Sequence, residues 1–252
     1  MNTLKLASAV TLILASAAAS ADILGVYAGA KRWNYDLDGT VRSGGNNIDV
    51  NRDLGLKDDD ANIYYLAFEH PLPFLPNIRI QQNELDGNEN GIASQDFSFQ
   101  SGSYQTGDSV ATRYDFSHTD YTLYYEILDN WVNLDLGFSA KDFDGFVDIR
   151  PDGQAIPALD YRVNLSGTVP LLYGRAQFDL PFTGWSAGGE LQVGKFDDDD
   201  LTDASAYVAY EGDSGFGFEL GYRLFELEFD DFDDLSSDLT IDGFYAGLSF
   251  HF

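Results

Sequence analysis

Apolar and polar residues alternate along the end of the chain, in residues 241–252. Counting back from the last residue in steps of two, the apolar positions are Phe252, Phe250, Leu248, Ala246 and Phe244. A period of two is typical of a β-strand with one apolar face. The stretch is longer than the roughly 9–11 residues with which a tilted strand crosses a hydrocarbon core. It predicts a membrane-crossing strand, with a buried edge strand of a soluble domain as the alternative.

The same alternation recurs through the chain and predicts nine further strands. Leu134 and Leu136, for example, share an apolar face, whereas Asn133 and Asp135 share the opposite one. The nine strands are expected at residues 23–33, 62–70, 78–85, 112–128, 131–143, 169–180, 185–196, 204–210 and 216–229.

The connections between these strands sort by length. Every second connection is short, at residues 71–77, 129–130, 181–184 and 211–215, and those between them are long or acidic. Short periplasmic turns and longer extracellular loops are typical of transmembrane β-barrels. The predicted fold is therefore all-β, a single-domain antiparallel up-and-down barrel of ten strands over residues 22–252, with eight or twelve strands as alternatives.

The beginning of the chain predicts the compartment. Residues 1–21 hold one Lys, an apolar run at 6–15 and the small residues Ala19, Ser20 and Ala21. This pattern is typical of a cleaved signal peptide. We expect export through the periplasm and residence in the cell outer membrane.

The polar strand faces predict a charged lumen. Five positive and six negative side chains would point inward, and their charges nearly cancel: Lys31, Arg79, Lys141, Arg175 and Arg223, with Glu69, Glu126, Asp135, Asp179, Glu190 and Glu219. A ten-stranded barrel has little spare interior, and an unpaired buried charge is costly. We expect these charges to pair and plug the lumen, with a narrow conducting path as the alternative.

The formal net charge of −28 excludes nucleic acid as a partner, because phosphate binding depends on Lys and Arg. The chain has no Cys, so disulfides and thiol chemistry are excluded. Acidic runs at residues 58–60, 197–200 and 230–234 predict a solvated fringe of extracellular loops. Loose binding of Ca²⁺ or Mg²⁺ by Asp197, Asp198, Asp199 and Asp200 is an alternative, but no complete calcium-loop motif is present. We expect no tightly bound metal or cofactor.

Histidine is the residue on which a hydrolytic site would depend, and the chain has three. His70 falls in a proline-rich turn and His251 is the penultimate residue, so His118 is the candidate. Ser117 precedes it, but neighbouring strand residues point to opposite faces. We expect no enzyme and treat His118 as an interfacial or loop-packing residue, with a surface hydrolase as the remote alternative.

Several motifs resemble a family of small outer-membrane β-barrel proteins of Gram-negative bacteria. They are Asp53-Leu-Gly-Leu56, the proline turn from Glu69 to Asn77, residues 123–128, 171–176 and 221–223, and Asp242-Gly-x-x-Ala-Gly-Leu248. The resemblance implies the barrel and its location, and it supplies no catalytic residues. The last strand also resembles the signal read by the barrel-assembly machinery, through Phe244, Gly247, Leu248, Phe250 and Phe252.

These observations predict a structural or surface-interaction role for a barrel with a plugged polar lumen. A narrow channel for small solutes or ions is the main alternative. The expected partners are outer-membrane lipid and lipopolysaccharide, together with the assembly machinery during biogenesis, and we expect a monomer.

Overall fold

The computed structural model describes residues 24–72, 74–153, 161–196, 199–232 and 235–252. The predicted signal peptide, residues 1–21, lies outside these stretches. No helix within them is long and apolar enough to cross a membrane.

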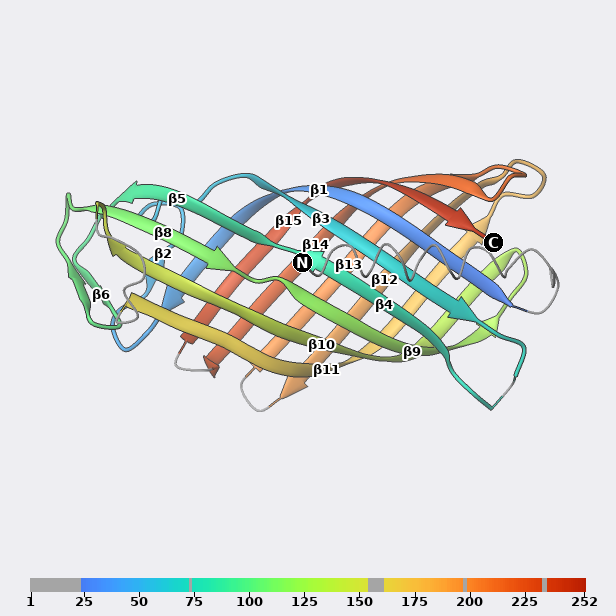
Figure 1. Ribbon diagram of the computed structural model, residues 1–252, viewed down its shortest axis with the longest axis horizontal. Coiled ribbons are helices and arrows are strands. Elements are labelled where there is room, and N and C mark those ends of the chain that lie inside the picture. The colour runs from blue at the N-terminus through green and yellow to red at the C-terminus, as the bar shows by residue number, and fades with distance from the viewer. Residues whose placement is uncertain (1–23, 73, 154–160, 197–198, 233–234) are drawn as a thin grey trace, which may run out of the picture.

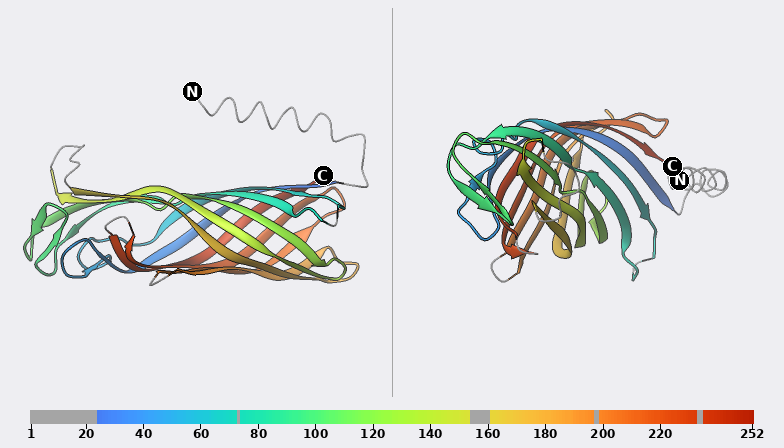
Figure 2. Two further views of the ribbon diagram at one scale, coloured as in Figure 1. Left: turned by 90° about the horizontal axis from the view of Figure 1, so that it is seen from below. Right: turned by 60° about the vertical axis from the view of Figure 1, so that its left-hand side comes forward.

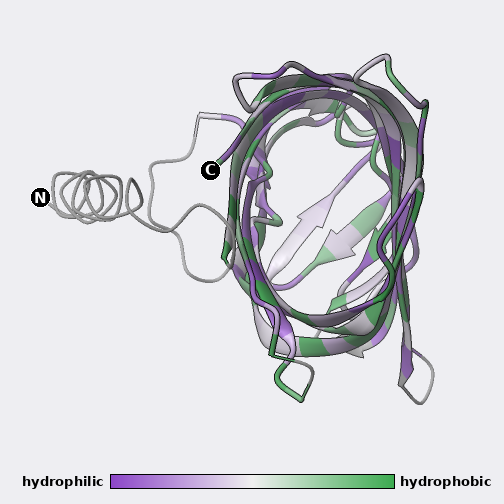
Figure 3. Ribbon diagram, turned by 90° about the vertical axis from the view of Figure 1, so that its right-hand side faces the viewer, coloured by the Kyte–Doolittle hydropathy of each residue, from purple (hydrophilic) through white to green (hydrophobic). Residues whose placement is uncertain are grey.

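Ten strands pair edge to edge and close into an antiparallel ring (Figure 1). In ring order they are β11 (Arg162–Asp179), β12 (Trp185–Phe196), β13 (Asp199–Glu211), β14 (Phe216–Phe232), β15 (Leu235–His251), β1 (Gly25–Arg42), β3 (Asp59–Glu69), β4 (Asn77–Glu84), β9 (His118–Leu128) and β10 (Val132–Pro151). Pairing of β10 with β11 closes the ring, which Figure 3 shows end-on. The predicted ten-stranded barrel is confirmed, and the alternatives of eight and twelve strands are wrong.

The two ends of the barrel differ. The end that we call the turn end carries the chain's last residue and the short connections, such as that between β3 and β4 (right in Figure 1). The opposite, loop end carries five additional short strands, coloured mostly green in Figure 2. They are β2 (Ile48–Asp49), β5 (Asp86–Ile92), β6 (Phe97–Phe99), β7 (Gly102–Tyr104) and β8 (Ser109–Asp115).

The predicted strand boundaries are accurate at the turn end and too short at the loop end. Strand β12 has the predicted bounds, whereas β1 continues to Arg42 and β10 to Pro151. The predicted strand 112–128 divides into β8 and β9, which pair in succession with the same edge of β10. The break lies at Phe116, whose backbone N–H donates to the Leu85 carbonyl at 2.8 Å.

The acidic segments expected as loops belong largely to strands, which corrects the prediction. Asp199 and Asp200 lie in β13, Asp230 in β14 and Asp238 in β15. Strand pairing continues here because carboxylates on the outer face remain in water, so these acidic residues need no loop. Asp197 and Asp198 fall outside the described residues.

Most of the long strands change their apolar face partway along. On β14, Phe216 and Leu220 are exposed on the outer face, whereas Phe225 and Leu227 are buried inside the barrel. The apolar side therefore switches between Leu224 and Phe225. An outer face against lipid must be apolar, whereas an outer face against water is polar and leaves the interior for apolar side chains. The switch marks the edge of the membrane-facing belt.

Beyond the belt, the interior of the barrel is a hydrophobic core. Its side chains come from strands on all sides of the ring and from the loop-end segments. The largest fully buried ones are Trp33, Tyr35, Leu37, Ile48, Leu54, Leu85, Phe99, Tyr104, Ile149, Leu201 and Phe225. This core fills the loop-end part of the lumen and leaves the polar part towards the turn end.

Candidate functional site in the barrel lumen

A buried group of charges lies directly beneath the hydrophobic core. We call it the Lys141 cluster, and it comprises Asn83, His118, Asp120, Lys141, Asp203 and Arg223. The Lys141 ammonium donates to Asp120 Oδ1 and Oδ2 at 3.0 and 2.9 Å and to Asp203 Oδ2 at 2.7 Å. Arg223 makes two hydrogen bonds to Asp203, at 2.8 and 2.7 Å, and a third to Asn83 Oδ1 at 2.9 Å. Two carboxylates and two cations thus compensate one another inside the barrel.

His118 belongs to this cluster, and its assignment to an interface or loop is wrong. Its ring packs between Phe143 and Phe225, with centroids 4.9 and 5.2 Å away. Its Nδ1 lies 2.9 Å from the Phe116 carbonyl oxygen. The side chain is fully buried, and Ser117 instead accepts a hydrogen bond from the Leu85 amide at 3.0 Å. Among the described residues, no serine hydroxyl forms a hydrogen bond with the His118 ring, and the ring itself is buried away from the surface.

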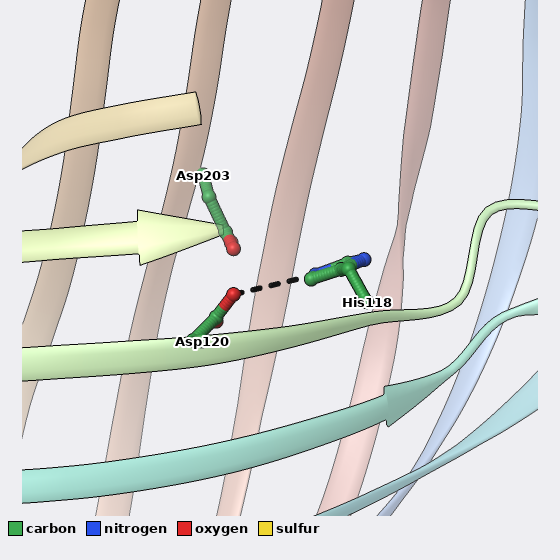
Figure 4. A group of neighbouring side chains, drawn as sticks. All are labelled: His118, Asp120 and Asp203. Carbon is green, nitrogen blue, oxygen red and sulfur yellow. Dashed lines mark ion pairs between the residues drawn. The ribbon is translucent and has the colours of Figure 1, made fainter. Parts of the chain in front are cut away.

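His118, Asp120 and Asp203 present one possible ligand atom each within 4.8 Å of one another (Figure 4). The Lys141 ammonium, however, lies within 2.7–3.4 Å of all three side chains. A bound metal ion would have to share that position with a positive charge. These residues fit the ammonium and do not fit a metal.

Three ion pairs follow the Lys141 cluster towards the turn end. Lys31 lies 2.7 Å from Glu219, Arg79 lies 2.5 Å from Glu190, and Arg175 lies 3.4 Å from Asp135. The Arg79–Glu190 pair joins β4 to β12, which are not neighbours in the ring, so this pair crosses the lumen. A cavity of about 20 Å³ between Lys31, the Arg79–Glu190 pair and Arg223 has room for a single water molecule.

A larger cavity of about 550 Å³ extends from the three ion pairs to the turn end. Residues of the turns, among them Asp129 and Pro181, line its opening together with Glu211 at the end of β13. Nine of the eleven predicted lumen charges line this cavity, whereas Lys141 and Arg223 lie in the buried cluster.

Sequence patterns missed several partners of these charges. Asp120 is two residues from Thr122 and six from Glu126, so the alternation places its side chain on the same inward face. The sequence therefore contained the information needed to predict Asp120 as a lumen residue. Asp203 precedes the predicted strand 204–210 by one residue, and extending that strand would have found it. Asn83 alternates with the predicted lumen residue Arg79, which indicated an inward side chain but not its contact with Arg223.

The Asp53 motif forms a second polar site, outside the membrane-facing belt. The buried Asp53 carboxylate accepts hydrogen bonds from the Asp49 amide, the Ser94 amide and hydroxyl and the Gln95 side chain, at 3.0, 3.2, 2.5 and 2.9 Å. Burial opposes ionisation, but these donors outweigh it and hold the pKa of Asp53 below its ordinary value. Asp53 thereby joins the β1–β3 connection to the segment after β5.

Replacing Asp53 with Asn should destabilise the loop end by about 2–3 kcal/mol, because an amide nitrogen would then face donors. The effect should appear as faster amide hydrogen exchange at Asp49 and Ser94. Since the folded pKa is lowered, the carboxylate contributes its stability above the unfolded pKa and loses it as the pH falls through the folded pKa. The difference in stability between Asp53→Asn and wild type should hence be constant above about pH 5 and should shrink in more acidic solution. A difference independent of pH would contradict this assignment.

The residues of the predicted assembly signal lie on β15 and after it. Phe244 and Leu248 are exposed on the outer face, and the Phe252 amide donates to the Val26 carbonyl at 3.0 Å. Recognition by assembly machinery stays a prediction. Loose cation binding near Asp199 and Asp200 also stays a prediction. Asp200 already forms an ion pair with Lys195.

A closed antiparallel ring with an apolar outer belt and a polar lumen defines a β-barrel of the outer-membrane type. The chain matches no protein-family model and no curated protein. Its membership of one particular barrel family therefore stays a prediction.

Among solved structures, the chain is similar to the CymD monoaromatic hydrocarbon channel at 12% identity and a TM-score of 0.35, over 92% of this chain and 70% of that one. It is similar to the transport unit of the autotransporter AIDA-I from Escherichia coli at 11% identity and a TM-score of 0.42, over 98% and 96%. It is also similar to Ail, the attachment invasion locus protein of Yersinia pestis, at 9% identity and a TM-score of 0.31, over 90% and 99%.

Proposed function

We propose that this chain is a non-conducting barrel of the outer membrane that acts at the cell surface through its loop end. The observation that carries the proposal is the hydrophobic core across the loop-end part of the lumen. Phe225, Leu37 and Ile149 are each no more than 2% exposed, and they come from β14, β1 and β10, which are not neighbours in the ring. A solute crossing the barrel would have to displace them.

The Lys141 cluster reinforces this closure. Its charges already satisfy one another at 2.7–3.0 Å, so a passing ion would have to replace partners that are fully desolvated. An ion that then entered the core would be unpaired among apolar side chains, at a cost of several kcal/mol. Conduction through a narrow channel is therefore the less favoured function.

The outer face of the loop end supports a role in surface interactions. Beyond the belt it carries carboxylates on neighbouring strands, with Asp200 opposite Glu228 and Glu228 opposite Asp238. Like charges directly opposite one another on a sheet are destabilising. We take this arrangement to serve contact with the polar surroundings of the membrane more than the stability of the barrel. Contact with lipopolysaccharide, which is anionic, would require bridging divalent cations.

The purified barrel should be silent in planar lipid bilayers over ±100 mV, because the core closes the lumen. Insertion must be established independently, for example by recovering folded protein from liposomes as a heat-modifiable band on a gel. Discrete, reproducible conductance steps from inserted protein would refute the proposal and favour the channel. Silence with demonstrated insertion would support it.

A further inference from the structure

The cavity at the turn end has no part in the proposed surface role. Its volume of about 550 Å³ lies within the range of roughly 300–1,000 Å³ that is typical of small-molecule sites. The Lys141 cluster and the hydrophobic core close it towards the loop end. A molecule that enters from the turn end would thus be retained in the cavity and would not pass through the barrel.

The charges that line this cavity do not balance. Lys31, Arg79 and Arg175 are each paired with one carboxylate at its inner end. Five further carboxylates line the cavity: Glu69, Glu126, Asp129, Asp179 and Glu211. The expected near-cancellation of lumen charges therefore does not extend to this part of the lumen, because Lys141 and Arg223 are committed elsewhere.

Near the opening, the side chains that donate hydrogen bonds to these carboxylates are mainly neutral. Glu69 accepts from the Tyr124 hydroxyl at 2.7 Å, and Glu126 accepts from the Asn77 amide at 3.1 Å. Asp179 accepts from the side-chain amides of Asn133 and Gln177 at 2.7 and 2.9 Å. These donors orient the carboxylates without cancelling their charge. The opening keeps a net negative charge among the described residues.

Aromatic faces accompany these carboxylates and indicate what kind of cation would fit. Six tyrosines line the cavity: Tyr27, Tyr65, Tyr124, Tyr173, Tyr207 and Tyr210. The barrel's own cations already use this chemistry, since Arg79 lies 5.2 Å from the centre of the Tyr65 ring. Tyrosine faces attract ammonium groups and also contact the methylene groups between them.

A single metal ion does not match this arrangement. In the described part of the chain, the Lys141 cluster supplies the sole group of three acidic or histidine side chains whose ligand atoms approach within 4.8 Å. The carboxylates at the opening are too dispersed to coordinate one ion together. A ligand that neutralises them must carry several separated positive charges.

We propose that the cavity binds an organic polyamine, in which ammonium groups are joined by short apolar chains. Its ammonium groups would pair with Glu69, Glu126 and Asp179, and its methylene groups would lie against the tyrosine faces. Such a ligand supplies the missing positive charge of the cavity. This binding is separate from the surface role and does not require passage through the barrel.

Isothermal titration calorimetry of the full chain in non-ionic detergent micelles, with spermidine as the probe, tests the proposal. Wild type should bind saturably at 100 mM NaCl. The double variant Glu69→Gln/Asp179→Asn should bind at least tenfold more weakly. The matched control Glu226→Gln/Glu228→Gln, which removes the same charge from the exposed outer face of β14, should change the affinity less than twofold.

Equal weakening in both double variants would overturn the proposal, because spermidine would then respond only to total charge. Displacement of spermidine by Mg²⁺ well beyond the effect of NaCl at equal ionic strength would also overturn it, in favour of a divalent-ion site. If the cavity double variant does not fold, Glu126→Gln serves instead. Glu126 is exposed, so this substitution should preserve folding and should weaken spermidine binding about threefold. An unchanged affinity for spermidine would count against the site.

Discussion

Replacing Lys141 with Ala should lower the free energy of unfolding by about 3–5 kcal/mol, because it leaves buried carboxylates without a cation. The Lys141 side chain is fully buried and donates to both Asp120 and Asp203. Asp203 would retain Arg223 at 2.7 Å, whereas Asp120 would lose its only short ion pair among the described residues. Urea unfolding of the barrel in phospholipid vesicles, followed by tryptophan fluorescence, measures this loss.

Two further variants separate this effect from a simple loss of packing. Asp120→Asn in the Lys141→Ala background should recover part of the stability, because it removes the uncompensated charge. Lys195→Ala removes an exposed lysine that is paired with Asp200, and it should cost no more than about 1 kcal/mol. Equal costs for Lys141→Ala and Lys195→Ala would show that the Lys141 cluster is not a buried charge network.

Replacing Trp33 with Ala should be similarly costly, at about 3–5 kcal/mol, because it opens a cavity where the core meets the charged cluster. Trp33 is 1% exposed. The centre of its ring lies 4.7 Å from the Arg223 guanidinium, and its Nε1–H donates to the Gly243 carbonyl at 3.2 Å. The substitution therefore removes apolar contacts, a cation–π contact and a hydrogen bond together. The same urea titration measures the change.

Trp33→Phe retains a ring under Arg223 and loses the indole donor, so it should cost markedly less than Trp33→Ala. Trp131→Ala is the matched control at the turn end, where the tryptophan is 59% exposed. Its cost should be less than half that of Trp33→Ala. A cost at Trp131 equal to that at Trp33 would contradict the assignment of a packed core beneath the loop end.

The strands were predictable because the membrane imposes a strict pattern on them. Lipid requires an apolar outer face, and the closed ring satisfies the backbone, so residues 185–193 and 216–224 alternate clearly. The loop-end extensions were missed because the alternation changes phase there. On β1, which was predicted to end at Trp33, Tyr35 and Leu37 continue the strand with the apolar side inward. On β14 the same change falls between Leu224 and Phe225, inside the predicted bounds. That change of phase is present in the sequence and predicts where the outer face leaves the lipid.

The sequence predicted which kinds of side chain line the lumen, but it did not predict which of them contact one another. Alternation indicated that Lys141, Arg175 and Glu190 would face inward, but periodicity along one strand contains no information about the strand across the ring. The Lys141 cluster joins β9 and β10 to β13 and β14. Which charge meets which depends on the stagger of the strands and on ring closure.

The sequence by itself determined that this chain forms an antiparallel barrel and favoured ten strands, because period-two alternation and connection lengths are local properties. Ring closure then excluded eight and twelve strands. The tertiary structure alone decided that a hydrophobic core closes one end of the lumen and that an acidic, tyrosine-lined cavity remains at the other. The reason is that both features are built from side chains of distant strands. Their apolar or charged character is written in the sequence, but their neighbours are fixed only when the ring closes.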